Sequence, residues 1–397
     1  MPMNRSSRLV GFTYVTLFVY SIASSVSITG PVMPLYVKSL GVSVIGWSVL
    51  VAALAVGMFL SEWVWGSLGD RTDRRLLMLL SVLALSGFSL LYTVHSLLPF
   101  FVVLQFATGA LIVAIGPLTR SYISDESPGA SMGLYVSLWW MFFLLGRVVG
   151  PLLGAYIAQT WAFEYSFWAS SLISVLLAVF ILVSFPREMH RRQAPKPNML
   201  GSLKLVLGRR SARFLFLSAL CMFMEFSLIS SFLPLYAYGE IKMSTVAVGV
   251  LVSSVSGAQL VAMPLVGWLS DKFGRKRTAL VGCLASSCLF LLYFAAGSGF
   301  QVLIVSIAIG LAFSGTALLL AMVPDVTPAT MQATTMGVYG SFEDLGSITA
   351  PLLFGFVWSV FGPVYIFAAT SIIEFMAVLL IHGIKQTTGK KAWNEVR

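Results

Sequence analysis

Charged side chains are scarce in this sequence. Asp, Glu, Lys and Arg make up 10% of its 397 residues, whereas a soluble domain carries about 25%. Hydrophobic residues make up 58%, and the apolar runs reach the roughly 20 residues that a membrane-spanning helix needs. The runs lack the strict alternation of membrane β-barrel strands. The composition therefore excludes an ordinary soluble domain and predicts an all-α integral membrane protein.

Cysteine and histidine are also sparse, with three residues of each. Three cysteines cannot pair completely, and all three fall inside apolar runs, where cysteine usually behaves as a small hydrophobe. No cluster of Cys, His and carboxylates has the spacing of metal ligands, so we expect neither a metal nor a cofactor. The sequence also lacks an ATP-binding loop and a nucleophile–base arrangement, which argues against an enzyme.

Twelve apolar spans follow one another along the chain. They lie near 11–36, 44–66, 76–94, 98–121, 133–158, 163–185, 213–237, 244–268, 278–296, 300–322, 333–359 and 363–384. With the N-terminus inside, only Lys38 and Lys242 among the basic residues between spans fall on the outer side. This asymmetry predicts a multi-pass protein of the cell membrane (inner or plasma membrane) with both termini in the cytoplasm. The net charge of +10 then reflects topology and contact with the lipid bilayer, not a nucleic-acid partner.

One long connection, 186–212, divides the spans into two sets of six. It is basic and proline-broken, and its stretch from Leu200 to Leu207 is amphipathic, as expected for a segment in the membrane interface. We therefore expect an N-terminal six-helix bundle over 1–185, a cytoplasmic linker over 186–212, and a C-terminal bundle with a cytoplasmic tail over 213–397.

The two halves repeat each other. Pro34-Leu35-Tyr36 recurs as Pro234-Leu235-Tyr236, and Gly146 with Pro151 recurs as Gly346 with Pro351, both at an offset of 200 residues. The segment GSLGDRTDRR (66–75) recurs as GWLSDKFGRK (267–276) at an offset of 201. Two parallel six-helix repeats are a transporter architecture, with the substrate site between the halves near the bilayer midplane.

The doubled loop segment resembles the G-x-x-x-D-R-x-x-R-R motif of the major facilitator superfamily, and the resemblance covers nearly the whole chain. It implies twelve helices in two pseudo-symmetric six-helix bundles. GRVVGPLLGA (146–155) resembles the fifth-helix motif of proton-coupled drug exporters in that superfamily. In such exporters helix 4 often carries an arginine four residues before a glycine, but here Gln105 precedes Gly109, and the first span has no acidic residue. Any proton role of that arginine must be absent or moved, for example to Arg147.

The resemblance implies a cytoplasmic gate that latches one side while the other is open. Its expected members are Gly66, which would let helix ends approach, the acidic residues Asp70, Asp125 and Asp271, and the basic residues Arg71, Arg74 and Arg275. The alternative reading is that the basic residues only enforce topology. Matching aspartates in both copies favour the gate.

Small residues mark one face of the fifth span. Gly146, Gly150 and Gly154 recur every four residues, so they share one helical face, and Pro151 bends the helix between them. Such a face allows close packing of backbones in a membrane. We expect helix packing here rather than substrate binding.

Ionisable residues inside the spans carry most of the functional information, because they are costly there and usually face a cavity or one another. The candidates for substrate binding or proton coupling are Arg147, Glu225, Glu343 and Asp344, together with Trp140, which shares a helical face with Arg147 at a spacing of seven residues. The alternatives are a static ion pair for the charged residues and helix packing or lipid contact for Trp140. Glu374 is expected to be structural, because helix 12 is peripheral in the superfamily.

The sequence therefore predicts a monomeric secondary transporter that moves a small organic molecule by alternating access, with proton-coupled export favoured. One alternative is a carrier for an organic anion or metabolite, with Arg147 as the carboxylate anchor. A second alternative is a membrane receptor or scaffold that transports nothing; the doubled gate and the lack of an extramembrane domain speak against it.

Overall fold

The computed structural model describes residues 5–69, 71–94, 96–126, 132–187, 207–313, 318–327 and 332–384. Within these ranges the chain is helical and no residue lies in a β-strand. Twelve helical stretches are long and apolar enough to cross a membrane, which confirms the predicted number of spans and the all-α fold class. The amphipathic stretch predicted from Leu200 lies almost wholly outside the described residues.

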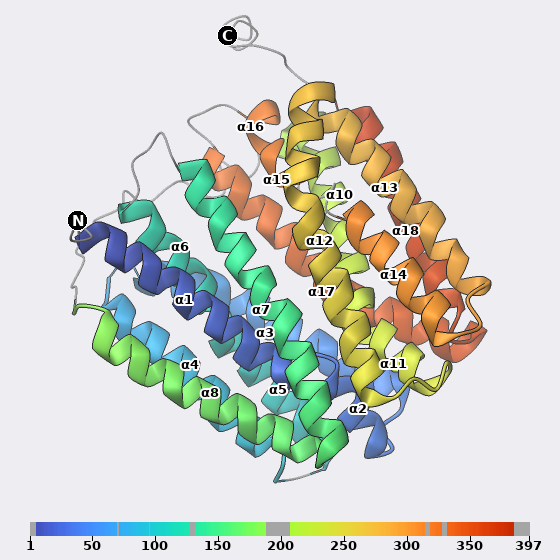
Figure 1. Ribbon diagram of the computed structural model, residues 1–397. Coiled ribbons are helices and arrows are strands. Elements are labelled where there is room, and N and C mark those ends of the chain that lie inside the picture. The colour runs from blue at the N-terminus through green and yellow to red at the C-terminus, as the bar shows by residue number, and fades with distance from the viewer. Residues whose placement is uncertain are drawn as a thin grey trace, which may run out of the picture. The chain divides into compact units, whose positions relative to one another are not determined.

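The first half contains eight helices along the described chain (Figure 1). They are α1 (Arg5–Val26), α2 (Val32–Ser39), α3 (Val44–Gly69), α4 (Arg74–Leu91), α5 (Leu98–Ile112), α6 (Ile115–Glu126), α7 (Met132–Thr160) and α8 (Phe163–Ser184). Helix α1 packs on α7 and α8, α3 on α5, and α4 on α8.

The second half follows the same order. Its helices are α10 (Arg210–Ser227), α11 (Leu233–Gly239), α12 (Thr245–Phe273), α13 (Arg275–Leu291), α14 (Gly299–Phe313), α15 (Leu318–Ala321), α16 (Val323–Val326), α17 (Gln332–Phe361) and α18 (Tyr365–Gly383), with a π-helical turn over Leu228–Phe232 and a 3-10 turn over Leu292–Phe294. Helix α10 packs on α17 and α18, and α13 packs on α18, as α4 does on α8.

Three of the predicted continuous spans are interrupted within the described residues: those at 11–36, 98–121 and 213–237. The first breaks before Pro31, which precedes α2, and the second breaks between α5 and α6, where Pro117 stands in the first turn; in the third, α-helix gives way to the π-helical turn Leu228–Phe232, just before Pro234 in α11. Proline lacks the N–H that would continue the helical hydrogen bonds. Interrupted helices are common around transporter sites, because they free backbone groups near the cavity.

The chain forms two compact units. The first comprises residues 1–194 and 230–257, and the second comprises 195–229 and 258–397. The chain thus passes from one unit to the other at Ile229 and Ser230, inside the π-helical turn. The sequence boundaries at 185 and 213 stay a prediction.

Apolar side chains lie on the outside of each unit, as lipid contact requires. Leu83, Leu172 and Val183 are exposed on the outer faces of α4 and α8. The buried contact between the same two helices is polar but small: the Ser86 and Ser171 hydroxyls lie 2.8 Å apart. Small hydrogen-bonding residues are the usual contacts between membrane helices, because they let backbones approach.

Candidate functional site

The glycine face of α7 lies against α1. A Cβ built at Gly150 would lie 2.6 Å from the Ser25 Cβ, and a Cβ at Gly154 would overlap the Val26 carbonyl oxygen. Gly146 is equally close, in its case to Ser21, whose hydroxyl donates to the Phe143 carbonyl at 2.7 Å. Only a residue without a side chain fits at these positions, so the two helices approach more closely here than ordinary side chains would permit.

The other side of α7 contacts the first part of α12, which belongs to the same unit. A Cβ at Gly249 would lie 2.9 Å from the Pro151 carbonyl oxygen. Near the end of α7, the Gln159 side-chain oxygen accepts a hydrogen bond from the Val246 amide at 2.8 Å. The segment 146–159 of α7 is therefore held between α1 and α12.

Arg147 lies at the start of this packed segment and is 9% exposed. Its guanidinium keeps its charge in proteins, so burial must be compensated by partners or water. Trp140 lies two turns earlier on α7 and is half-buried. Its ring meets Trp139 edge to face at 5.1 Å and Phe143 at 5.8 Å. The structure thus gives Trp140 aromatic packing partners within its own helix.

The loop after α3 is joined to α6 by a buried ion pair. The Arg74 Nη1 lies 2.6 Å from the Asp125 Oδ2, and the two side chains are 4% and 15% exposed. Arg71 is exposed, and Asp70 lies outside the described residues. The close approach expected at Gly66 is not seen, because no atom of the described chain lies within 4 Å of a Cβ built there; Gly69 instead meets the Leu118 side chain at 2.7 Å.

The second copy of the loop is looser. The Arg275 Nη1 lies 3.5 Å from the Asp325 Oδ1, with side chains 43% and 32% exposed, and it also donates to the Ala321 carbonyl at 2.7 Å. Asp271 is exposed. Gly274 begins α13 with φ +91°, a backbone conformation that favours glycine.

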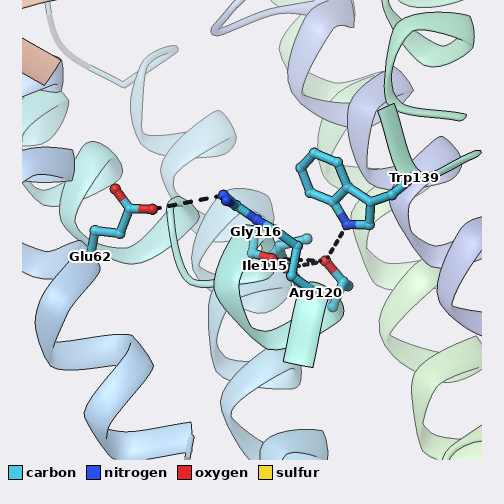
Figure 2. A network of polar contacts seen from close by, with 6 residues as sticks. Glu62, Ile115, Gly116, Arg120 and Trp139 are labelled. Carbon is cyan, nitrogen blue, oxygen red and sulfur yellow. Dashed lines mark hydrogen bonds and ion pairs between the residues drawn. The ribbon is translucent and has the colours of Figure 1, made fainter. Parts of the chain in front are cut away.

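A polar network that the sequence did not predict lies close to the first loop (Figure 2). The Arg120 guanidinium lies 3.8 Å from the Glu62 carboxylate and 5.0 Å from the centre of the Trp139 ring. The Trp139 indole N–H donates to the Thr119 hydroxyl at 3.0 Å. Figure 2 shows Arg120 reaching from α6 toward Glu62 on α3. Nothing in the sequence alone pairs Arg120 with Glu62, a residue 58 positions earlier.

The acidic candidates of the second unit divide into two sets. Glu343 and Asp344 are half-buried on α17, with both side chains engaged in contacts. Glu225 on α10 is fully buried, at 0% exposure, and so is Glu374 on α18. The carboxyl groups of Glu225 and Glu374 lie within hydrogen-bonding reach of each other. The structure thus unites Glu225 with the residue to which the sequence had given only a structural role.

Within the described ranges, no group of three or more His, Cys, Asp and Glu side chains is arranged to hold a metal ion. Cys221 and Cys283 are buried and Cys288 is exposed, and all three are free thiols.

Comparisons with known proteins agree with the sequence motifs. The family model of the Major Facilitator Superfamily matches residues 14–246 and 215–395. Multidrug resistance protein MdtG from Salmonella schwarzengrund is 24% identical over 415 residues, covering 100% of this chain and 97% of the relative. The MdtG of Salmonella arizonae is also 24% identical, over 95% of each chain.

Solved structures show the same fold at low identity. A nucleoside transporter, NupG, has a TM-score of 0.79 with 11% identity, covering 96% of this chain and 100% of its own. A D-xylose-proton symporter has a TM-score of 0.77 with 15% identity, covering 96% and 99%. An inward-facing bacterial homologue of the human lysosomal transporter Spinster has a TM-score of 0.74 with 14% identity, covering 97% and 95%. The chain is a multi-pass membrane protein and belongs to the Major Facilitator Superfamily, a family of transporters rather than enzymes.

Proposed function

We propose that the protein exports small organic molecules by alternating access and that inward movement of protons drives the export. The observation that carries the proposal is the segment 146–159 of α7, which is held between α1 and α12 and contains the buried Arg147. This segment includes the stretch that resembles the drug-exporter motif. The MdtG relatives are named multidrug resistance proteins, which supports drug-like substrates.

Contacts within the first unit support a second gate, at the end of the helices that is predicted to face the outside. Helix α3 begins at Val44, one turn before Trp47, and ends at Gly69, near the Arg74–Asp125 pair. At its Trp47 end, the indole N–H donates to the Ser231 carbonyl at 3.2 Å. In the same unit, α2 packs on α11. These contacts join the first half to the outer part of the seventh span, and alternating access requires them to break and re-form.

A screen by thermal shift tests the substrate class. The full-length purified protein is tested against lipophilic cations such as ethidium and against organic anions of similar size. Stabilisation by cations supports the exporter. Stabilisation by anions alone favours the second candidate, a carrier in which the buried Arg147 binds a carboxylate.

Transport in proteoliposomes tests the coupling. We expect an imposed pH gradient to drive ethidium movement and a protonophore to abolish it. Arg147→Ala should abolish gradient-driven movement, and Arg147→Lys should restore little of it, because an ammonium lacks the planar, five-donor geometry of guanidinium. Wild-type transport that ignores the pH gradient would exclude proton coupling. The half-buried Asp344 and Glu343 are tested in the same assay as Asp344→Asn and Glu343→Gln.

A further inference from the structure

Two carboxyl groups face each other inside the second unit. Glu225 on α10 and Glu374 on α18 are each 0% exposed, and their carboxyl groups lie within hydrogen-bonding reach. None of their four oxygens receives a hydrogen bond of ordinary geometry from the described residues. The nearest donors are the Ser286 hydroxyl, beside Glu225, and the Cys283 thiol, beside Glu374, both on α13.

The described residues around the pair supply no positive charge. Neither carboxyl group forms an ion pair with a described residue. The titratable groups that face the pair are the thiols of Cys221 on α10 and Cys283 on α13. Beyond Cys283 lies the phenol of Tyr339 on α17, which in turn neighbours Glu343. The acids are thus surrounded by neutral groups at three packed helices.

Proton chemistry follows from this arrangement. An ionised carboxylate is only an acceptor, so a hydrogen bond between two carboxyl groups needs a proton on one of them. Two carboxylates that share a buried site cannot both be ionised without a large cost. An occluded pair of this kind is therefore suited to sharing one proton between its two carboxyl groups and to binding a second.

Packing does not require acids at these positions. At the offset of 200 residues that relates the halves, Glu225 corresponds to Ser25 on α1 and Glu374 corresponds to Ser174 on α8. Both serines are buried, at 1% and 0% exposure. The first half thus fills the corresponding places with small neutral residues, so the repeated fold does not require acids there, and the costly acids in the second half point to a purpose other than packing.

The pair also lies next to a part of the chain suited to movement. Three residues after Glu225, α10 passes into the π-helical turn Leu228–Phe232, where the chain crosses from the second unit into the first. Such turns are weaker than α-helix and often occur at functional sites. A change in this turn would move Glu225 relative to Glu374 and open the pair to water.

We propose that Glu225 and Glu374 form a proton-binding carboxyl pair that couples proton movement to transport. This inference rests on the proposed proton-coupled function and assigns its proton site to α10 and α18. In one step, the pair with one shared proton takes up a second proton when it is opened to the acidic side. In the other step, that proton leaves toward the opposite side. No other bond forms or breaks.

The test uses Glu225→Gln, Glu374→Gln and the double variant in the full-length protein, with Ser174→Ala as the matched control from the first half. Glutamine keeps the shape but removes the titrating proton. We expect either single variant to lose pH-gradient-driven ethidium movement while keeping ethidium exchange, and the control to keep both. Infrared spectra should show a protonated-carboxyl band in the wild type that the double variant lacks.

Three outcomes would overturn the inference. If the Glu374→Gln variant shows gradient-driven transport at the wild-type rate, Glu374 on α18 does not belong to the coupling site. Absence of the protonated-carboxyl band from the wild type would exclude the pair as a proton site, yet leave the exporter proposal standing. If the wild type moves ethidium independently of the pH gradient, both the coupling role of the pair and the proposed proton-driven export are wrong. The infrared band would then still show whether the pair binds a proton. Thermal unfolding of each variant checks that it has folded.

Discussion

The contacts of α1 with α8 and of α10 with α18 occupy corresponding places in the two halves but differ in chemistry. In the first half, the Ser170 hydroxyl donates to the Ala23 carbonyl of α1 at 2.6 Å, and the Ser174 hydroxyl donates to the Ser170 carbonyl within α8. In the second half, the acids Glu225 and Glu374 meet in the same contact. In a repeated fold, one copy of a helix–helix contact can thus serve packing alone, while the other copy contains a titratable pair.

The two gate loops also differ, but here the first half has the more strongly charged contact, because its ion pair is shorter and more buried than that of the second half. Asp125→Asn would leave the 4% exposed Arg74 without a counter-ion, and breaking a buried pair costs about 3–5 kcal/mol. Asp325→Asn acts on a partly exposed pair at 3.5 Å, where the loss is about 0–1 kcal/mol. Thermal unfolding followed by tryptophan fluorescence should show a much larger drop for Asp125→Asn. Equal drops would mean that burial of Arg74 contributes nothing to the first loop.

The close approach of α7 to α1 gives the next largest expected effect on stability. Gly154→Ala places a Cβ on the Val26 carbonyl oxygen, so α7 must move away from α1, and overpacking of this kind costs about 1–3 kcal/mol. The control is Gly87→Ala on α4, where a Cβ meets nothing within 4 Å of the described chain and alanine favours the helix by about 1 kcal/mol. The melting temperature should fall for Gly154→Ala and hold or rise for Gly87→Ala. A fall in both would show that the loss does not come from the α1–α7 contact.

Among the variants that alter helix packing, substitution of Ser170 should change stability least. Ser170→Ala removes the hydrogen bond to Ala23 and the 3.1 Å contact with the Ser89 hydroxyl. Interhelical hydrogen bonds in membranes average about 0.6 kcal/mol, so we expect a small loss of stability and unchanged ethidium transport. Ser174→Ala, which loses only a bond within its own helix, serves as the control. A Ser170→Ala protein that folds but does not transport would contradict the assignment of the first-half contact to packing.

The sequence revealed the spans but not their breaks. Long apolar runs and the 200-residue offset were enough to predict twelve helices in two repeats. The runs stay apolar through the breaks, so hydropathy alone could not locate them, although Pro31, Pro117 and Pro234 stand at or beside them. Proline in an apolar run is ambiguous in a membrane, because it also occurs inside unbroken helices such as α7.

For the candidate site, the sequence identified single residues but not their partners. Glu225 was selected because it lies in the middle of a span, whereas Glu374 was set aside because its helix is peripheral in the superfamily. The offset that relates the halves carries part of the missing information: α1 packs on α8, so α10 should pack on α18, and Glu225 and Glu374 lie on those two helices. Arg120 and Glu62 had no such guide, since their contact depends on how α6 crosses α3.

The smallest expected effect concerns a second difference between the halves, at the contact of α2 with α11, which we call the outer gate. Lys38 follows Pro34-Leu35-Tyr36, whereas Tyr238 holds the equivalent place after Pro234-Leu235-Tyr236. The Lys38 amine lies over Gly239, where any Cβ would overlap it. Burial in this contact lowers the pKa of the Lys38 ammonium, Lys242 lowers it further, and Glu240 raises it in part.

The sign of the pH effect follows from that lowered pKa. The closed contact favours the neutral amine, so it is penalised while Lys38 is charged, and the penalty disappears as the pH rises through the lowered pKa toward the ordinary lysine value. Spin labels on α2 and α11 should therefore report a slightly larger closed fraction at alkaline pH than at neutral pH. Lys38→Met, which keeps the length of the side chain without its charge, should remove the pH dependence and hold the contact closed at both values. An unchanged pH dependence in Lys38→Met would assign the effect to another group, whereas a contact that opens at alkaline pH would show that the ammonium holds the gate shut through Glu240.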